Sequence, residues 1–151
     1  MPEDGLVVTL ESNPHHADVA RANIAEAGLA LKTEVSIGPA ERTLRGMIEH
    51  GARKFDLVFI DADKPSNPVY LSLVKQLIKP GAIVIGDNIV RDGAVIDASS
   101  EDDRVQGVRE FTRSMGEDDD FQATALQTVG VKGWDGFTLA IFSPRASNRE
   151  A

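Results

Sequence analysis

The stretch Phe55-Asp56-Leu57-Val58-Phe59-Ile60-Asp61-Ala62-Asp63-Lys64 carries the strongest strand signal of the chain and ends in a charged cluster. Its apolar, β-branched and aromatic residues over 55–60 are typical of a strand. A second apolar run, Ala82 to Gly86, ends in Asp87-Asn88 in the same way. In open parallel sheets, ligands bind beyond the carboxyl ends of the strands. The two runs therefore predict a ligand site at one rim of an α/β sheet.

Strand and helix patterns alternate around this stretch. Leu6–Leu10 reads as a strand buried on both faces, and 33–37 as a weaker strand. Helical spacing predicts a helix from Pro14 to a stop at Gly28, one with Leu44, Met47 and Ile48 inward, and one from Asn67 through Ile78. Three β–α repeats in a row predict a parallel sheet with right-handed crossovers.

The C-terminal part of the chain follows a different pattern. Ser99 or Ser100 is expected to cap a helix that runs through Met115. Phe121–Val129 and Phe137–Phe142 are expected to form an antiparallel hairpin at one edge of the sheet. The predicted fold is thus a mostly parallel α/β sheet with a C-terminal hairpin.

Composition limits the possible functions. The 151 residues fit a single domain, which we place at 1–143 with a loose tail at 144–151. Sixteen Lys and Arg against 24 Asp and Glu give a net charge of −8, which argues against nucleic-acid binding as the main role. The absence of cysteine excludes disulfides, thiolate catalysis and zinc-finger sites. No apolar run is long enough for a membrane span and the N-terminus is no signal peptide, so we expect a cytoplasmic protein.

Oxygen-bearing side chains at the predicted rim suggest a metal site. Asp61, Asp87 and Asn88 offer two carboxylates and an amide oxygen, the donors that Mg²⁺, Mn²⁺ or Ca²⁺ prefer. If their strands are parallel neighbours, about 5 Å separates the two backbones, and both carboxylates can reach one cation. In the alternative interpretation, Asp87 and Asn88 only cap a turn before Gly93.

Lys64 and Glu11 are two further candidates at the strand ends. A cation near Lys64 would favour its uncharged amine, the form that accepts a proton as a general base. The alternative for Lys64 is an ordinary solvated lysine. Glu11 ends the first strand, where an acid commonly binds the hydroxyls of a ribose. Its alternative role is to support the start of the helix at Pro14.

Three aromatic residues carry weaker signals. His15 and His16 have no further His or Cys cluster to complete a metal site, so we expect them on the surface. Trp134 is the one tryptophan. Its position is equally consistent with a residue that packs the hairpin and with a residue that lines a substrate site.

These strand ends resemble those of a known family. Val7-Val8-Thr9-Leu10-Glu11, the Asp61-Ala62-Asp63-Lys64 motif, Gly86-Asp87-Asn88 and Asp135–Ile141 are similar to the cation-dependent O-methyltransferases, the group of catechol and caffeoyl-CoA O-methyltransferases and their bacterial relatives. The resemblance covers about the whole chain. It implies a Rossmann-like class I methyltransferase sheet, S-adenosylmethionine as methyl donor, and a divalent cation that orients a small hydroxylated, catechol-like acceptor.

The resemblance also implies roles for individual residues. Asp61, Asp87 and Asn88 would hold the metal, and Lys64 with Asp61 would be catalytic. Glu11, Gly38, Ala40 and Asp61 would bind the cofactor, with Glu11 on its ribose and Ala40 beside its adenine. It further implies a homodimer without nucleic-acid or membrane partners.

The sequence departs from the family pattern in three places. Asn67 stands where the family usually has tyrosine, and Arg91 where it often has an aromatic residue, so we expect a different acceptor pocket. Arg91 would meet an acidic acceptor or pair with Asp92.

The third departure is larger. The family's N-terminal part, with a central strand and a Gly-rich cofactor loop, has no counterpart here. Without that central strand, the sheet would have a gap. We consider three explanations: the sheet closes up, another chain fills the gap, or the natural protein is longer, which is our favoured hypothesis. Alternative functions are an inactive metal- or nucleotide-binding module and a dimerisation partner that has lost the cofactor cradle.

Overall fold

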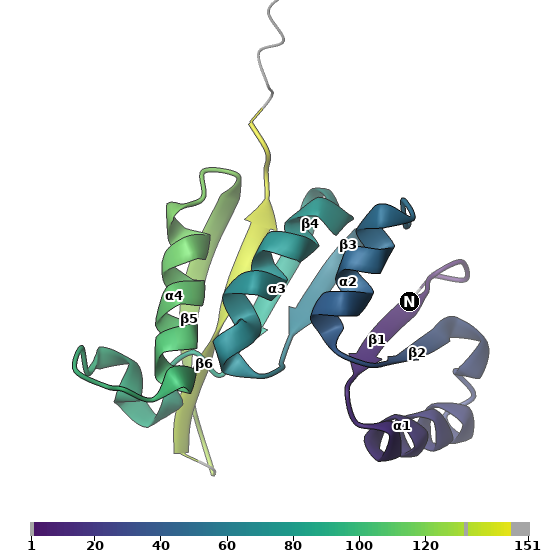
Figure 1. Cartoon of the computed structure of the whole chain (residues 1–151), viewed down its shortest axis with the longest axis horizontal. Coiled ribbons are helices and arrows are strands. Elements are labelled where there is room, and N and C mark those ends of the chain that lie inside the picture. The colour runs from purple at the N-terminus through teal and green to yellow at the C-terminus, as the bar shows by residue number, and fades with distance from the viewer. Residues whose placement is uncertain (1, 132, 146–151) are drawn as a thin grey trace, which may run out of the picture. The chain divides into compact units, whose positions relative to one another are not determined.

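A computed structural model of the chain describes residues 2–131 and 133–145 (Figure 1). It divides into two compact units, Met1–Gly51 and Ala52–Ala151. The stretch predicted as one domain, 1–143, thus holds two units. The tail predicted to be loose, 144–151, lies outside the described residues from 146 onward.

The first unit is a small parallel β–α arrangement. Strands β1 (Val7–Glu11) and β2 (Thr33–Ile37) pair in parallel, and the helices are α1 (Pro14–Glu26) and α2 (Ala40–Glu49), with the 3₁₀ turn η1 (Ala30–Lys32) before β2. Asn13 caps α1, because its Oδ1 accepts the His15 N–H at 2.9 Å. The predicted positions of these elements are confirmed. The prediction that the first strand is buried on both faces is wrong, since Val7 is exposed and the rest of β1 is half-buried.

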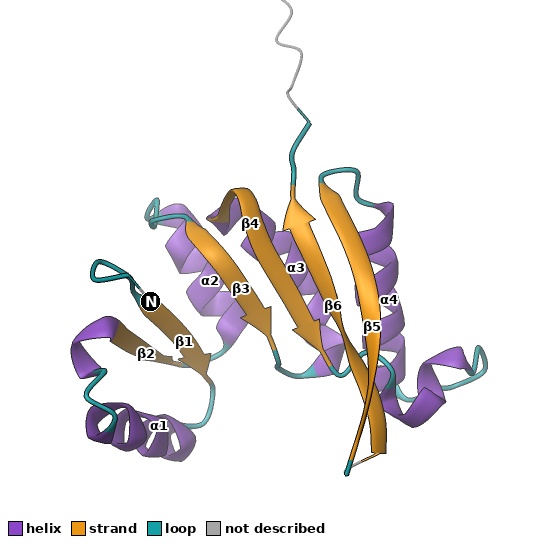
Figure 2. Cartoon of the chain, turned by 180° about the vertical axis from the view of Figure 1, so that it is seen from behind, coloured by secondary structure: helices purple, strands orange, loops and turns teal. Residues whose placement is uncertain are grey.

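The second unit is a mixed sheet with helices on one face. Its described strands follow the order β3-β4-β6-β5, with β3 (Phe55–Ile60), β4 (Ile78–Asp87), β5 (Phe121–Gly130) and β6 (Gly133–Phe142). Strands β3 and β4 are parallel, whereas β6 is antiparallel to both β4 and β5. Helices α3 (Asn67–Val74) and α4 (Asp103–Glu117) cover the same face of this sheet (Figures 1 and 2). The predicted edge hairpin is confirmed.

The end of α3 differs from the prediction. The helix ends at Val74, the 3₁₀ turn η3 (Lys75–Leu77) follows, and Ile78 already belongs to β4. Ile78 pairs with Phe55, whereas the next pair of the ladder is Leu57 with Ile83, so β4 bulges between them. This bulge accommodates Pro80, which cannot donate a ladder hydrogen bond. Lys79-Pro80-Gly81 therefore lies inside the strand.

Helix α4 also starts differently from the prediction. Its cap is Asp102, whose carboxylate accepts the Arg104 N–H at 2.8 Å, rather than Ser99 or Ser100. Ser99 instead donates its hydroxyl to Asp97, so it belongs to the turn that precedes the cap. An aspartate competes with serine for this position on equal terms, so the sequence left the choice open.

The core of the second unit lies between the sheet and its two helices. Phe111 of α4 and Val84 of β4 are completely buried, and Met115 is almost so. This packing fixes α4 against the central strands of the sheet. No helix within the described ranges is long and apolar enough to cross a membrane.

Candidate active site

The carboxyl ends of β3 and β4 bring two predicted metal ligands together. Ile60 pairs with Gly86, so Asp61 and Asp87 come directly after paired residues of neighbouring parallel strands. About 5 Å separates such neighbours. The side chain of Asp61 is 50% exposed, which leaves it accessible to a ligand. The strand pairing that the metal hypothesis requires is therefore present.

Lys64 lies beside Asp61 and is buried. It opens the 3₁₀ turn η2 (Lys64–Ser66) and is only 7% exposed. Its Nζ donates a hydrogen bond to Asp61 Oδ1 at 3.1 Å. A lysine is rarely this buried unless it is paired. Lys64 is therefore no ordinary solvated lysine.

Asp63 anchors the segment that carries Lys64. Tyr70 donates its hydroxyl to Asp63 Oδ1 at 2.7 Å, and the Ser66 hydroxyl donates to Oδ2. Burial raises the pKa of Asp63, but these hydrogen bonds outweigh it and hold the pKa below its ordinary value. Asp63 thus stays charged and ties the turn to α3.

The loop after β4 is held by one carboxylate of β6. Asp135 Oδ1 accepts the backbone N–H groups of Val90, Arg91 and Gly136 at 2.9–3.1 Å. Burial raises the pKa of Asp135, but these bonds and one from the Asn88 side chain outweigh it and lower the pKa. Because a carboxylate only accepts, the Asn88 amide nitrogen must donate to it, which leaves the Asn88 Oδ1 free for another partner.

This loop has an uncommon backbone conformation. Asn88, Arg91 and Asp92 have φ values of 58°, 53° and 52°, in the left-handed region. Such values are uncommon outside glycine, although Asn and Asp adopt them more readily than other residues. Asp87 Oδ1 also accepts the Asn88 N–H at 2.8 Å. The Asp87 Oδ2 remains available beside it. The Gly93 N–H donates to the Val90 carbonyl at 3.0 Å, so a turn precedes Gly93, as the alternative interpretation expected.

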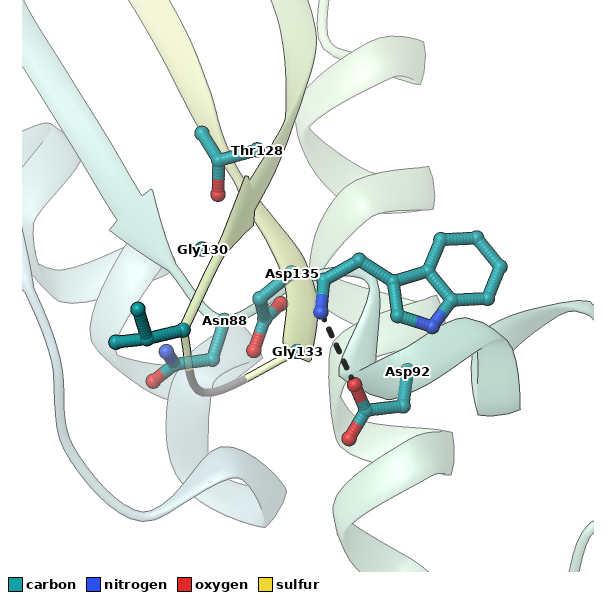
Figure 3. A pocket seen from close by; sticks show the side chains of 8 residues that line it. Asn88, Asp92, Thr128, Gly130, Gly133 and Asp135 are labelled. Carbon is teal, nitrogen blue, oxygen red and sulfur yellow. Dashed lines mark hydrogen bonds between the residues drawn. The ribbon is translucent and has the colours of Figure 1, made fainter.

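A cavity opens next to Asn88, between this loop and the tip of the β5–β6 hairpin (Figure 3). Its volume is about 430 Å³. The lining residues come from the loop, from both strands of the hairpin and from the turn between them: Asn88, Asp92, Thr128, Gly130, Val131, Gly133, Trp134 and Asp135. The cavity therefore adjoins one of the predicted metal ligands.

Trp134 packs the hairpin, and its role as a wall of a substrate site stays a prediction. Its backbone N–H donates to Asp92 Oδ1 at 3.2 Å, and its ring lies so close over Gly93 that a Cβ there would be 3.0 Å from it. The residue thus packs the hairpin onto the loop. It also lines the cavity and is 43% exposed, so the ring is accessible.

The predicted cofactor residues of the first unit gather at the ends of β1 and β2. Glu11 pairs with Ile37, and the Gly38 N–H donates to the Glu11 carbonyl at 2.9 Å. Ala40 opens α2. The Glu11 Oε1 accepts the Asn13 N–H at 2.8 Å, which is the supporting role at the start of α1 that the alternative interpretation gave it. Its side chain is still one-third exposed.

The two histidines and Asn67 differ in burial. His15 and His16 are exposed, as expected. Among the residues that the structure describes, no group of three or more His, Cys, Asp or Glu is placed to hold a metal. Asn67 is fully buried, and neither atom of its amide has a hydrogen-bond partner within the described ranges.

Sequence reasoning did not identify the contacts that Asp92 and Asp135 make, and it gave no role to Gly107. Asp135 acts across 45 positions of sequence on Val90, and Asp92 across 42 positions on Trp134. These contacts depend on how β6 pairs with β4, which no local motif records. Gly107 lies against the backbone of Lys64, but nothing in the helix pattern of α4 marks this glycine.

Comparison with known proteins places the chain in a family. The family model described as O-methyltransferase matches residues 1–141. The chain belongs to the O-methyltransferase family. The sequence is 43% identical over 141 residues to the catechol O-methyltransferase of Niastella koreensis, covering 93% of this chain and 64% of that protein. It is 47% identical over 137 residues to the catechol O-methyltransferase of Mycobacterium tuberculosis, covering 91% and 60% of the two chains.

A solved structure supports the same assignment. The O-methyltransferase from Bacillus cereus, solved in complex with SAH, has a TM-score of 0.92 and 46% identity, over 95% of this chain and 65% of that one. The predicted family and fold class are confirmed. The chain spans somewhat less than two-thirds of the length of these relatives.

Proposed function

We propose that this chain takes part in S-adenosylmethionine-dependent, divalent-cation-assisted methyl transfer to a hydroxyl group of a small, catechol-like acceptor. The observation that carries the proposal is the pairing of Ile60 with Gly86, which places Asp61 and Asp87 side by side with the buried Lys64 on Asp61. The catechol O-methyltransferases among the relatives, and the SAH in the Bacillus cereus structure, support the choice of acceptor and donor.

The donor chemistry of the site fits a hard cation. Asp61 is half exposed, Asp87 keeps one carboxylate oxygen free, and Asn88 presents its amide oxygen, so three oxygen atoms would hold Mg²⁺, Mn²⁺ or Ca²⁺. Such a cation, when bound, makes a hydroxyl group easier to deprotonate. The remaining positions around it would be filled by water and acceptor.

Lys64 supplies the proton transfer in this proposal. Its Nζ, held at Asp61, would accept the proton of the acceptor hydroxyl when the amine is uncharged, since only that form has a free electron pair. With the donor bound, the acceptor oxygen would form a bond to the sulfonium methyl carbon as the carbon–sulfur bond breaks, and the electron pair of that bond would stay on sulfur. Most of the rate comes from holding the two reactants in line. Glu11, Gly38 and Ala40 would bind the ribose and adenine of the donor.

The cavity beside Asn88 is the proposed acceptor site. The Trp134 ring offers a flat apolar surface suited to an aromatic ring, while Asp92 and Thr128 offer polar partners. This arrangement favours a small planar acceptor with several hydroxyl groups. A homodimer, and the absence of nucleic-acid and membrane partners, stay predictions.

Calorimetric titration of the 151-residue chain with S-adenosylhomocysteine, in the presence of Mg²⁺, tests the proposal. Micromolar binding supports an enzyme, and no binding supports an inactive module or a chain that needs a further segment. Asp61→Ala and Asp87→Ala should each abolish metal-dependent turnover, because each would remove a ligand of the cation. Asp87 is not among the predicted cofactor residues, so Asp87→Ala should leave cofactor affinity within about twofold. Turnover that survives both substitutions and EDTA would overturn the metal assignment.

A further inference from the structure

Helix α4 contacts both halves of the predicted metal and base site, although it contributes no residue to it. Two residues of α4 make these contacts, Gly107 and Phe111. They lie four positions apart, so they sit on the same face of the helix, one turn from each other. Each touches backbone atoms next to a proposed functional side chain.

The first contact joins Gly107 to the turn that begins with Lys64. A Cβ at position 107 would lie 2.2 Å from the Lys64 carbonyl oxygen, 2.6 Å from its carbonyl carbon and 2.7 Å from the Pro65 Cα. These are backbone atoms, which cannot rotate away as the end of a side chain can. Glycine at this position therefore lets η2 lie directly against α4, where Lys64 becomes buried and meets Asp61.

The second contact joins Phe111 to the end of β4. A Cβ at Gly86 would lie 2.4 Å from Phe111 Cε1 and 2.9 Å from Thr138 Oγ1. Phe111 is completely buried, and Thr138 Oγ1 accepts the Gly86 N–H at 3.1 Å. The residue directly before Asp87 is thus held between the Phe111 ring and β6.

We propose that α4 is the positioning element of the site, with Gly107 fixing Lys64 and Phe111 fixing the strand end that bears Asp87. The effect of α4 on catalysis rests on the proposed function, because that proposal gives Lys64 and Asp87 their roles. The effect of α4 on the positions of these two residues does not depend on the proposed function. Displacing α4 from either contact should release one half of the site and leave the other in place.

The test of the first contact compares Gly107→Ala with Gly116→Ala. Gly116 lies in the same helix, and a Cβ there would meet nothing within 4 Å, so it controls for the gain in helix propensity. Brief labelling of lysine amines, read by peptide mass spectrometry, measures the accessibility of Lys64. Lys79, whose side chain is 43% exposed, serves as the internal reference.

We expect Lys64 to label slowly in the parent chain and in Gly116→Ala, and several-fold faster in Gly107→Ala. In a preparation that methylates an acceptor, Gly107→Ala should lower kcat with little change in KM, and Gly116→Ala should change neither. A folded Gly107→Ala chain in which Lys64 stays as protected as in the parent would overturn the proposal. The labelling needs no turnover, so it stands or falls independently of the methyltransferase proposal.

Phe111→Leu keeps the test decisive if Gly107→Ala does not fold. It shortens the side chain against Gly86 without adding an atom, and Met115→Leu in the next turn is its matched control. Hydrogen exchange over residues 84–90 should rise several-fold in Phe111→Leu and stay at the parent rate in Met115→Leu, while Lys64 labelling stays slow in both. Equal exchange in the two variants would refute the second contact.

Discussion

The two units are stabilised in different ways. In Ala52–Ala151, the sheet packs against α3 and α4, and large side chains such as Phe111 are completely buried. Within the described part of Met1–Gly51, Ala17 and Leu44 are the buried hydrophobic residues. In this unit, local hydrogen bonds at the ends of β1, β2 and α1 contribute more to stability than burial does. The proposed metal and base residues thus lie on a well-packed unit, and the proposed cofactor residues on a unit with little core of its own.

The largest expected effect comes from removing the centre of the packed unit. Phe111→Ala should lower the free energy of unfolding by about 3–5 kcal/mol, because it deletes a fully buried ring. Urea unfolding followed by the fluorescence of Trp134, the single tryptophan, reports on this unit. Leu44→Ala is the matched change in the other unit, and we expect it to leave the Trp134 transition almost unchanged. Equal shifts would show that the two units unfold together.

A smaller effect is expected at the helix cap of the first unit. Asn13→Ala removes the acceptor of the His15 N–H and should cost about 1 kcal/mol locally. Because little burial supports α1, we expect faster amide hydrogen exchange over 14–26 and no change over α4. Asp102→Ala removes the corresponding cap of α4 and is the control. If both variants raised exchange in their helices equally, burial would not be what distinguishes the units.

The smallest effect concerns an ion pair at the corner between α4 and β5. Lys75 Nζ donates to Asp118 at 2.6 Å and lies 2.8 Å from an Asp120 carboxylate oxygen. Lys75→Met should cost up to about 1 kcal/mol at pH 7, and Lys79→Met, which breaks the more exposed pair with Asp56, should cost less. Urea unfolding of both variants measures the difference.

The pH dependence of this corner follows from Asp120. The hydrogen bond from Lys75, helped by the Arg145 N–H, lowers the pKa of Asp120 below its ordinary 3.8. A carboxyl group with a lowered pKa in the folded state stabilises the fold above its unfolded value and loses that contribution as the pH falls through the folded value. The stability gap between the parent and Lys75→Met should therefore shrink below pH 3.8. A gap that stayed constant down to pH 2 would contradict this origin.

Much of the fold could be predicted from the sequence because its signals are local. The strands at 33–37 and 55–60, the cap at Asn13 and the edge hairpin follow from apolar runs, a capping residue and turn glycines. The end of α3 could not be predicted in this way. Lys79-Pro80-Gly81 is typical of a helix stop followed by a loop, and only the pairing of Ile78 with Phe55 turns it into a bulged strand.

The candidate site, too, could be predicted from the sequence only in part. The proximity of Asp61 and Asp87 could be inferred from strand order, since parallel neighbours end at the same rim. The burial of Lys64 could not, because it depends on Gly107, 43 positions away in the sequence. The hydrogen bonds that Asp135 accepts from the loop after β4 could not be predicted either, because they join residues that are far apart in the sequence.

That loop has a consequence for binding affinity. Three of its non-glycine residues, Asn88, Arg91 and Asp92, have left-handed backbone conformations, and each of these conformations costs free energy in the folded chain. Asp135 holds the loop in this form by accepting the N–H groups of Val90 and Arg91. One wall of the adjoining cavity is therefore already ordered before a ligand binds. Binding of a small molecule there would not have to order a flexible segment, so little affinity would be lost in this way. The affinity would depend mainly on how well the shape of the molecule matches the cavity.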